Sequence, residues 1–208
     1  AMHQDMDLRA SALLKANTDQ DYAIVKELGA NFLRLAHYPH NDYEYQKCDE
    51  MGIIVQTEIP WVNNCGVRAE QVYFDNIHEQ MKEMITNLYN HPSIVFWGMW
   101  NELDSWGNND KLQGKADFPR VVSETAKLYD YAKSLDPNRM VGLSDDSNYE
   151  RDGYTSLKAD YYSENRYNGW YYGKFAEFGR DMLNIHKKMG ICNVSEYGCG
   201  INPFCHIA

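Results

Sequence analysis

Apolar residues along the chain alternate between two patterns, one typical of helices and one typical of short buried strands. Windows with apolar side chains at helical spacing end at Gly or at Asn/Pro positions, and a short apolar run follows each of them. This pattern predicts helices at residues 21–28, 42–51, about 70–89, 121–135 and 175–188. It predicts strands at residues 32–36, 53–57, 94–102, 140–143, 161–165 and 191–196.

A repeated helix-to-strand step indicates an α/β protein in which helices cover a parallel sheet. Polar residues gather where the predicted strands end, among them His37, Glu58, Asn101, Asn165 and Glu196. In a (β/α)8 barrel, such strand ends form the active-site face. A doubly wound open sheet gives the same alternation. However, no G-x-G-x-x-G follows a strand, so the motif that most often accompanies an open sheet is absent from the sequence.

Composition narrows the classes of protein and of partner. The 208 residues are 44% hydrophobic and 24% charged, which fits one globular domain over residues 1–208. The net charge of -10 makes nucleic acid an unfavourable partner, and the longest strongly apolar stretch, residues 94–100, is too short to cross a membrane. The cellular compartment stays undecided.

The five cysteines are an odd number without a C-x-x-C pair, which argues against a disulfide framework or a zinc ribbon. Cys199, Cys205 and His206 offer a weak alternative as metal ligands near the end of the chain. We favour the interpretation that their proximity is incidental.

Two glutamates at strand ends are the candidate chemical groups. Hydrolysis of a glycosidic bond needs one carboxylic acid to protonate the leaving oxygen and one carboxylate to attack or stabilise the anomeric carbon. Glu102 and Glu196 end two strong strands, and a barrel brings such distant ends together. A surface charge or an ion pair is an equal alternative for either glutamate alone. Asn101 adds a donor for a sugar hydroxyl, and stacking faces come from Trp97, Trp100, Trp106 and Trp170, of which we expect Trp97 and Trp100 to be partly buried.

Five segments resemble the sequence motifs of one enzyme family. Residues 31–39, residues 48–53 and residues 91–102, the last ending in Trp100-Asn101-Glu102, resemble in this order the signature run of glycoside hydrolase family 2. Residues 165–171 and 195–198 resemble two later motifs of the same catalytic barrel. The family includes β-galactosidases and β-glucuronidases, and the resemblance covers nearly the whole chain.

The resemblance implies a retaining β-glycosidase with Glu102 as acid/base and Glu196 as nucleophile. Glu102 would start protonated, and the two carboxyl groups would lie about 5 Å apart, as a covalent glycosyl-enzyme intermediate requires. By the same matching, Arg34 would keep the nucleophile ionised and Tyr167 would hydrogen-bond it. The full set of expected substrate-binding residues is His3, Arg34, His37, Asn101, Asn165, Tyr167 and Trp170.

The chain departs from the family pattern in two places. Where metal-dependent relatives carry an acidic residue and a histidine, the sequence is Trp61-Val62-Asn63-Asn64, so we expect no metal site and no cofactor. Only Ala1 to His3 could belong to a first strand, and 208 − 196 = 12 residues follow Glu196. We therefore expect an incomplete (β/α)8 barrel with a truncated first strand and no eighth strand, which by itself is weakly active or inactive. Its exposed edges should cause either instability or self-association into a homo-oligomer.

Substrate choice is the least determined expectation. Gly198-Cys199-Gly200 and the later His206 are more similar to the β-galactosidase branch, so a β-galactoside is the first expectation and a β-glucuronide the second. A barrel that binds sugar without hydrolysing it, or an inactive remnant, is the alternative from another class of function.

Overall fold

The computed structural model describes residues 1–6, 9–63, 71–103, 118–146, 154–190 and 192–199. Its strands form one parallel sheet in chain order, each paired with the next. The strands are β1 (Phe32–Leu35), β2 (Ile54–Glu58), β3 (Ile94–Asn101), β4 (Met140–Asp145), β5 (Tyr161–Arg166) and β6 (Cys192–Tyr197).

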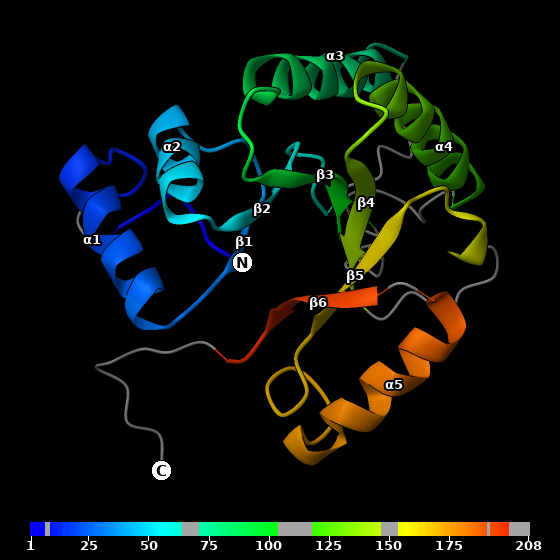
Figure 1. Cartoon of the computed structure of the whole chain (residues 1–208). Helices are drawn as coiled ribbons and strands as arrows, with labels where there is room; N and C mark the ends of the chain where they lie inside the picture. The colour runs from blue at the N-terminus through cyan, green and yellow to red at the C-terminus, as the bar shows by residue number, and fades with distance from the viewer. Residues whose placement is uncertain (7–8, 64–70, 104–117, 147–153, 191, 200–208) are drawn as a thin grey trace.

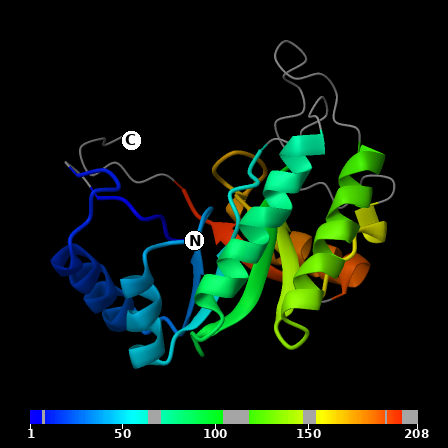
Figure 2. The same ribbon diagram turned by 90° about the horizontal axis from the view of Figure 1, so that it is seen from above.

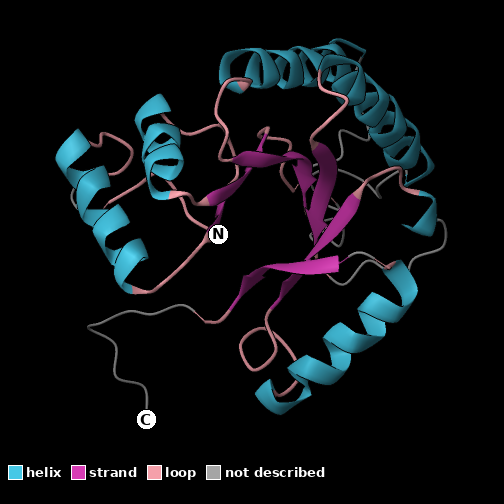
Figure 3. Cartoon of the chain, in the orientation of Figure 1, coloured by secondary structure: helices cyan, strands magenta, loops and turns pink. Residues whose placement is uncertain are grey.

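Helices surround this sheet on its outer side (Figures 1 and 3). Seen along a perpendicular direction, α3 and α4 lie beside the strands as an outer layer (Figure 2). The α-helices are α1 (Lys15–Glu27), α2 (Asp42–Met51), α3 (Gln71–Leu88), α4 (Phe118–Leu135) and α5 (Phe178–Met189), with 3-10 turns η2 (Tyr154–Ser156) and η3 (Phe175–Glu177). The curled parallel sheet with external helices confirms the incomplete (β/α)8 barrel.

Met2 and Ala1 connect the two ends of the curled sheet. Met2 pairs with Leu35 of β1 in a parallel bridge, as a remnant of a preceding strand would. The amino group of Ala1 donates to the carbonyl oxygen of Ser195 in β6 at 3.4 Å. The described residues therefore come close to closing a ring from β1 to β6. Among them, no helix is both long and apolar enough to cross a bilayer.

Helix α2 has the bounds that the sequence predicts because both of its ends carry strong local signals. The Asn41 side chain accepts a hydrogen bond from the Glu44 amide at the start, and acidic Asp42 and Glu44 fill the first turn. Gly52 ends the helix with φ +68°, a left-handed conformation that glycine adopts without steric cost.

Helix α1 begins six residues before the position predicted from apolar spacing. Residues 15–20 are mostly polar, so periodicity gives no signal there. In the structure, the Asn17 side chain accepts from the Leu14 amide at 3.0 Å and Thr18 is buried. Capping and the burial of a threonine therefore extend the helix, and neither effect contributes to a hydrophobic pattern.

Trp97 and Trp100 of β3 belong to the core and offer no face to a sugar. Both side chains are almost fully buried. The Trp97 indole donates to Asp136 at 3.1 Å, and the Trp100 indole donates to Thr125 of α4 at 3.1 Å. The stacking interpretation is thus wrong for both, and the expected partial burial was an underestimate. Trp106 lies outside the described residues.

Candidate active site

Arg34 of β1 lies at the centre of a buried polar cluster at the carboxyl ends of the strands. Its side chain is 1% exposed, and its Nε and Nη2 donate to the two carboxylate oxygens of Glu58 at 2.9 and 2.8 Å. Its Nη1 donates to Glu196 at 2.6 Å. Burial disfavours the charged guanidinium, but Glu58 and Glu196 outweigh it and hold the pKa of Arg34 above its usual value. Arg34 is therefore a fixed cation between two carboxylates.

Glu58, the last residue of β2, is a member of the cluster to which the sequence assigned no role. Burial alone would favour its neutral form, yet the Arg34 charge and hydrogen bonds from His37 and Arg34 hold the pKa of Glu58 below its ordinary range. His37 Nδ1 lies 2.7 Å from Glu58. A β-carbon on Gly98 would come within 2.5 Å of the Glu58 β-carbon, so a glycine at this point of β3 makes space for the glutamate. Its place at a strand end, just before Ile59-Pro60, was the available signal.

Glu196 of β6 is held at both carboxylate oxygens. Oε1 accepts from Arg34 and lies 3.5 Å from His37 Nε2. Oε2 accepts from the hydroxyl of Tyr167. Burial and this hydrogen bond raise the pKa of the Tyr167 phenol well above its usual value, so the hydroxyl remains a donor. A cation and a hydroxyl thus orient an anionic carboxylate that is 14% exposed.

Two asparagines connect the region of Glu196 with Glu102. Asn165 of β5 is fully buried, and its Nδ2 donates to Asn101 at 3.0 Å and to Glu102 Oε1. Arg34 Nη2 donates to Asn101 at 2.7 Å, and Arg34 Nη1 lies 3.4 Å from Asn165 Oδ1. Each glutamate therefore bonds directly to a member of one shared network.

The backbone presents Glu102 in an uncommon conformation. Its φ is +48°, in the left-handed region where a non-glycine residue costs roughly 1–2 kcal/mol. The Glu102 amide donates to the carbonyl oxygen of Ser144 in β4 at 2.9 Å, which fixes the chain directly after β3. Local strain of this kind concentrates at functional positions, where the surrounding structure compensates for it.

His3 and Trp170 lie at the edge of the cluster and are exposed. The His3 ring meets the His37 ring edge-on, with centroids 5.0 Å apart. Trp170 lines an apolar pocket of about 310 Å³, together with Phe175, Tyr197 and neighbouring residues. Of the expected site residues, the structure brings together Arg34, His37, Asn101, Asn165 and Tyr167 with both glutamates, and leaves His3 and Trp170 at the margin.

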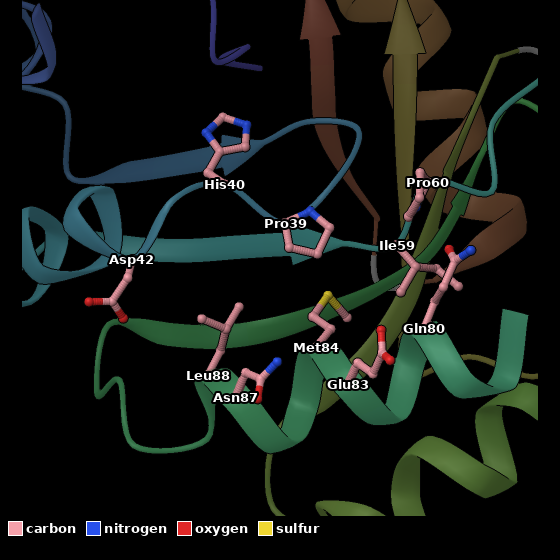
Figure 4. A pocket seen from close by; sticks show the side chains of 10 residues that line it. All are labelled: Pro39, His40, Asp42, Ile59, Pro60, Gln80, Glu83, Met84, Asn87 and Leu88. Carbon is pink, nitrogen blue, oxygen red and sulfur yellow. The ribbon is translucent and has the colours of Figure 1, made fainter. Parts of the chain in front are cut away.

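A second pocket, of about 410 Å³, lies between α3 and the segments that follow β1 and β2 (Figure 4). Its lining includes His40, Pro60 and Met84, and none of the site residues expected from the sequence. The buried polar network and this pocket are therefore separate features of the fold.

No group of three or more side chains suited to hold a metal occurs among the described residues. Within that part of the chain, Cys48 and Cys199 are free thiols. Cys205 and His206 lie outside the described residues, so the weak metal-ligand interpretation has no structural test here.

The loop after β5 is fastened to α5 by Asp181. Its carboxylate accepts from Asn168 and Arg166, both at 2.9 Å. The hydrogen bond from Asn168 and then that from Arg166 lower the pKa of Asp181 to about 2. Since Asn168 and Arg166 also line the pocket at Trp170, this carboxylate supports one wall of that pocket.

We expect the substitution Asp181→Asn to reduce stability in a pH-dependent way. A lowered pKa contributes stability that is present above the unfolded-state pKa, near 3.9, and is lost as the pH falls through about 2. At pH 7 the variant should be less stable by about 1 kcal/mol, because partial exposure screens the interaction. Urea unfolding should show the difference closing between about pH 4 and pH 2.

Asp130→Asn is the matched control, because the ion pair of Asp130 with Lys158 is exposed and should contribute little. A stability difference for Asp181→Asn that stays constant from pH 7 to pH 2 would contradict the prediction.

Comparisons with known proteins match this chain to one protein family. The family model "Glycosyl hydrolases family 2, TIM barrel domain" matches residues 1–201. A curated relative named beta-glucuronidase, from Bacteroides fragilis, is 34% identical over 97% of this chain and 28% of its own length. The chain thus spans about a quarter of the curated relatives it matches first.

Solved structures that are similar to this chain carry names of the same kind as the curated relatives. Beta-glucuronidase 2 from Bacteroides uniformis, covalently bound to cyclophellitol-6-carboxylate aziridine, has a TM-score of 0.85 and 31% identity, covering 96% of this chain and 24% of that one. A putative beta-galactosidase from Bacteroides fragilis has a TM-score of 0.81 and 30% identity, covering 97% and 28%. Of the three matches described here, two are named beta-glucuronidase and one is named putative beta-galactosidase.

Proposed function

Because this chain belongs to family 2 of the glycosyl hydrolases, we propose that it supplies most of the catalytic barrel of a longer retaining β-glycosidase. Residues 1–208 are the catalytic domain segment in this proposal, with Glu102 as acid/base and Glu196 as nucleophile. The observation that carries it is the shared network in which Arg34 and Tyr167 hold Glu196 while Asn165 holds Glu102.

The proposed reaction has two steps. Glu196 attacks the anomeric carbon and Glu102 gives its proton to the departing oxygen, which leaves a sugar bonded to the Glu196 carboxylate. Glu102 then removes a proton from water, and the resulting attack releases the sugar with its original configuration. Neutralisation of Glu196 in the first step leaves the charge of Arg34 balanced by Glu58 alone, so Glu58 keeps the cation in place.

Around these carboxylates, His37, Asn101 and Tyr167 provide polar groups for sugar hydroxyls, and Trp170 provides an exposed ring for stacking. His3 stands beside His37 at the rim. For the substrate we propose a β-glucuronide, which is supported by the names of the relatives and not by a carboxylate-binding group among the described residues. A β-galactoside is the second candidate, favoured by the likeness to the putative beta-galactosidase.

The test is hydrolysis of aryl β-glucuronides and aryl β-galactosides by the purified full-length protein. We expect kcat/KM to be higher for the glucuronide by at least about a hundredfold. In this proposal the full-length protein supplies polar groups for the substrate carboxylate, and a galactoside would leave those groups unpaired. A reversed preference would replace the glucuronide with the galactoside. Absence of turnover on both, with a folded protein, would reject the proposed hydrolysis itself.

A further inference from the structure

Ser195, directly before Glu196, donates a buried hydrogen bond into the site network. Its Oγ lies 2.6 Å from Oδ1 of Asn165, and both residues are buried. In the described part of the chain, the other donor near this oxygen is Arg34 Nη1, whose contact of 3.4 Å is longer and therefore weaker. The hydroxyl of Ser195 is thus the principal partner of the Asn165 amide oxygen.

An irregularity in the sheet directs Ser195 into the barrel beside Glu196. The register between β5 and β6 pairs Glu164 with Val194 and Asn165 with Glu196, so Ser195 is the additional residue of a bulge. In a regular strand, consecutive side chains point to opposite faces, whereas a bulge re-aims one of them. Consecutive residues of β6 can therefore both reach the interior network.

Holding the Asn165 oxygen determines what Asn165 presents to Glu102. With Oδ1 bonded to Ser195, the Nδ2 group faces Asn101 Oδ1 at 3.0 Å and Glu102 Oε1. The lone pair of Glu102 Oε1 that accepts the Asn165 N–H cannot also carry the acidic proton of Glu102. In the proposed function, the proton that Glu102 transfers is therefore carried by Oε2, the oxygen to which Asn165 does not donate.

We propose that Ser195 is a positioning residue for the acid/base: its hydroxyl fixes the Asn165 amide, which fixes the oxygen of Glu102 that transfers the proton. This inference rests on the proposed function. Without the hydroxyl, Asn165 Oδ1 keeps only the long contact with Arg34, so the amide rotates more freely and Glu102 loses its fixed orientation. Proton transfer by Glu102 then becomes slower. The rate of attack by Glu196 stays unchanged, because Arg34 and Tyr167 hold Glu196 separately.

The test compares leaving groups in the full-length protein carrying Ser195→Ala. For an alkyl glycoside, whose leaving oxygen must be protonated, kcat/KM should fall about tenfold. For an aryl glycoside with a strongly acidic phenol, it should fall less than about threefold, because that departure needs little protonation. Ser195→Thr keeps a hydroxyl and should restore the alkyl rate to within about threefold of wild type.

Ser163→Ala is the matched control, because Ser163 lies in β5 with a buried hydroxyl that has no hydrogen-bond partner among the described residues. It should leave both rates unchanged. Equal losses for the two leaving groups in Ser195→Ala, or rates equal to those of Ser163→Ala, would overturn the role of Ser195. Failure of Ser195→Thr to restore the alkyl rate would overturn it as well. A wild-type protein without hydrolysis would instead reject the proposed function.

Discussion

Replacing Glu196 by alanine is expected to lower kcat by roughly four orders of magnitude or more, because loss of a nucleophile removes the covalent route altogether. Arg34 would keep its two hydrogen bonds to Glu58, so its charge stays paired and the fold should persist. The measurement is steady-state hydrolysis of an aryl β-glucuronide by the full-length variant, with thermal unfolding recorded alongside.

Two further observations would identify Glu196 as the group that attacks. Cyclophellitol-6-carboxylate aziridine should label wild type on the peptide that contains Glu196 and should leave Glu196→Ala unlabelled. Added azide should enter the space left by the carboxylate and give a glycosyl azide of inverted configuration from an activated substrate. Retention of more than about a tenth of the wild-type rate would contradict the assignment.

The order and type of the elements could be predicted because each helix or strand of this chain carries its own local signal. Helix α2 shows this best, with Asn41 as its N-cap and Gly52 as its stop. Helix α1 shows the limit, since its first turn depends on Thr18 packing into the core and on Asn17 bonding to Leu14. These interactions depend on side-chain geometry and on three-dimensional packing, which apolar periodicity does not report.

Much of the candidate site could also be predicted, because parallel strands place their ends at one edge. Arg34, Asn165 and Glu196 follow from that rule together with the family motifs. Glu58 and Ser195 did not, because their roles depend on partners in other strands. In particular, the bulge that turns Ser195 toward Asn165 is a property of the pairing between β5 and β6.

The tryptophans of β3 expose a different limit. A large aromatic residue near a strand end could face a sugar or pack between the sheet and its outer helices, and from the sequence we expected Trp97 and Trp100 to be only partly buried. Trp97 and Trp100 pack in the core, and their indoles donate to Asp136 and Thr125. Trp170 remains a candidate stacking residue, because it lies in the loop after β5 and is half exposed.

Replacing Glu102 by alanine is the second large effect we expect, and its size should depend on the leaving group. For an alkyl glycoside, kcat/KM should fall by about a thousandfold, within the range ascribed to general acid catalysis. For an aryl glycoside with a strongly acidic phenol, kcat/KM should fall by less than about tenfold, because the phenolate departs without a proton.

In the Glu102→Ala variant, attack of water on the glycosyl-enzyme would still lack its base, so kcat on the aryl substrate should be low. Azide needs no base, so it should restore turnover and give a product of retained configuration, opposite to that from Glu196→Ala. Equal losses on every leaving group, or an inverted azide product, would show that Glu102 does not transfer the proton and that the roles of the two glutamates must be reassigned.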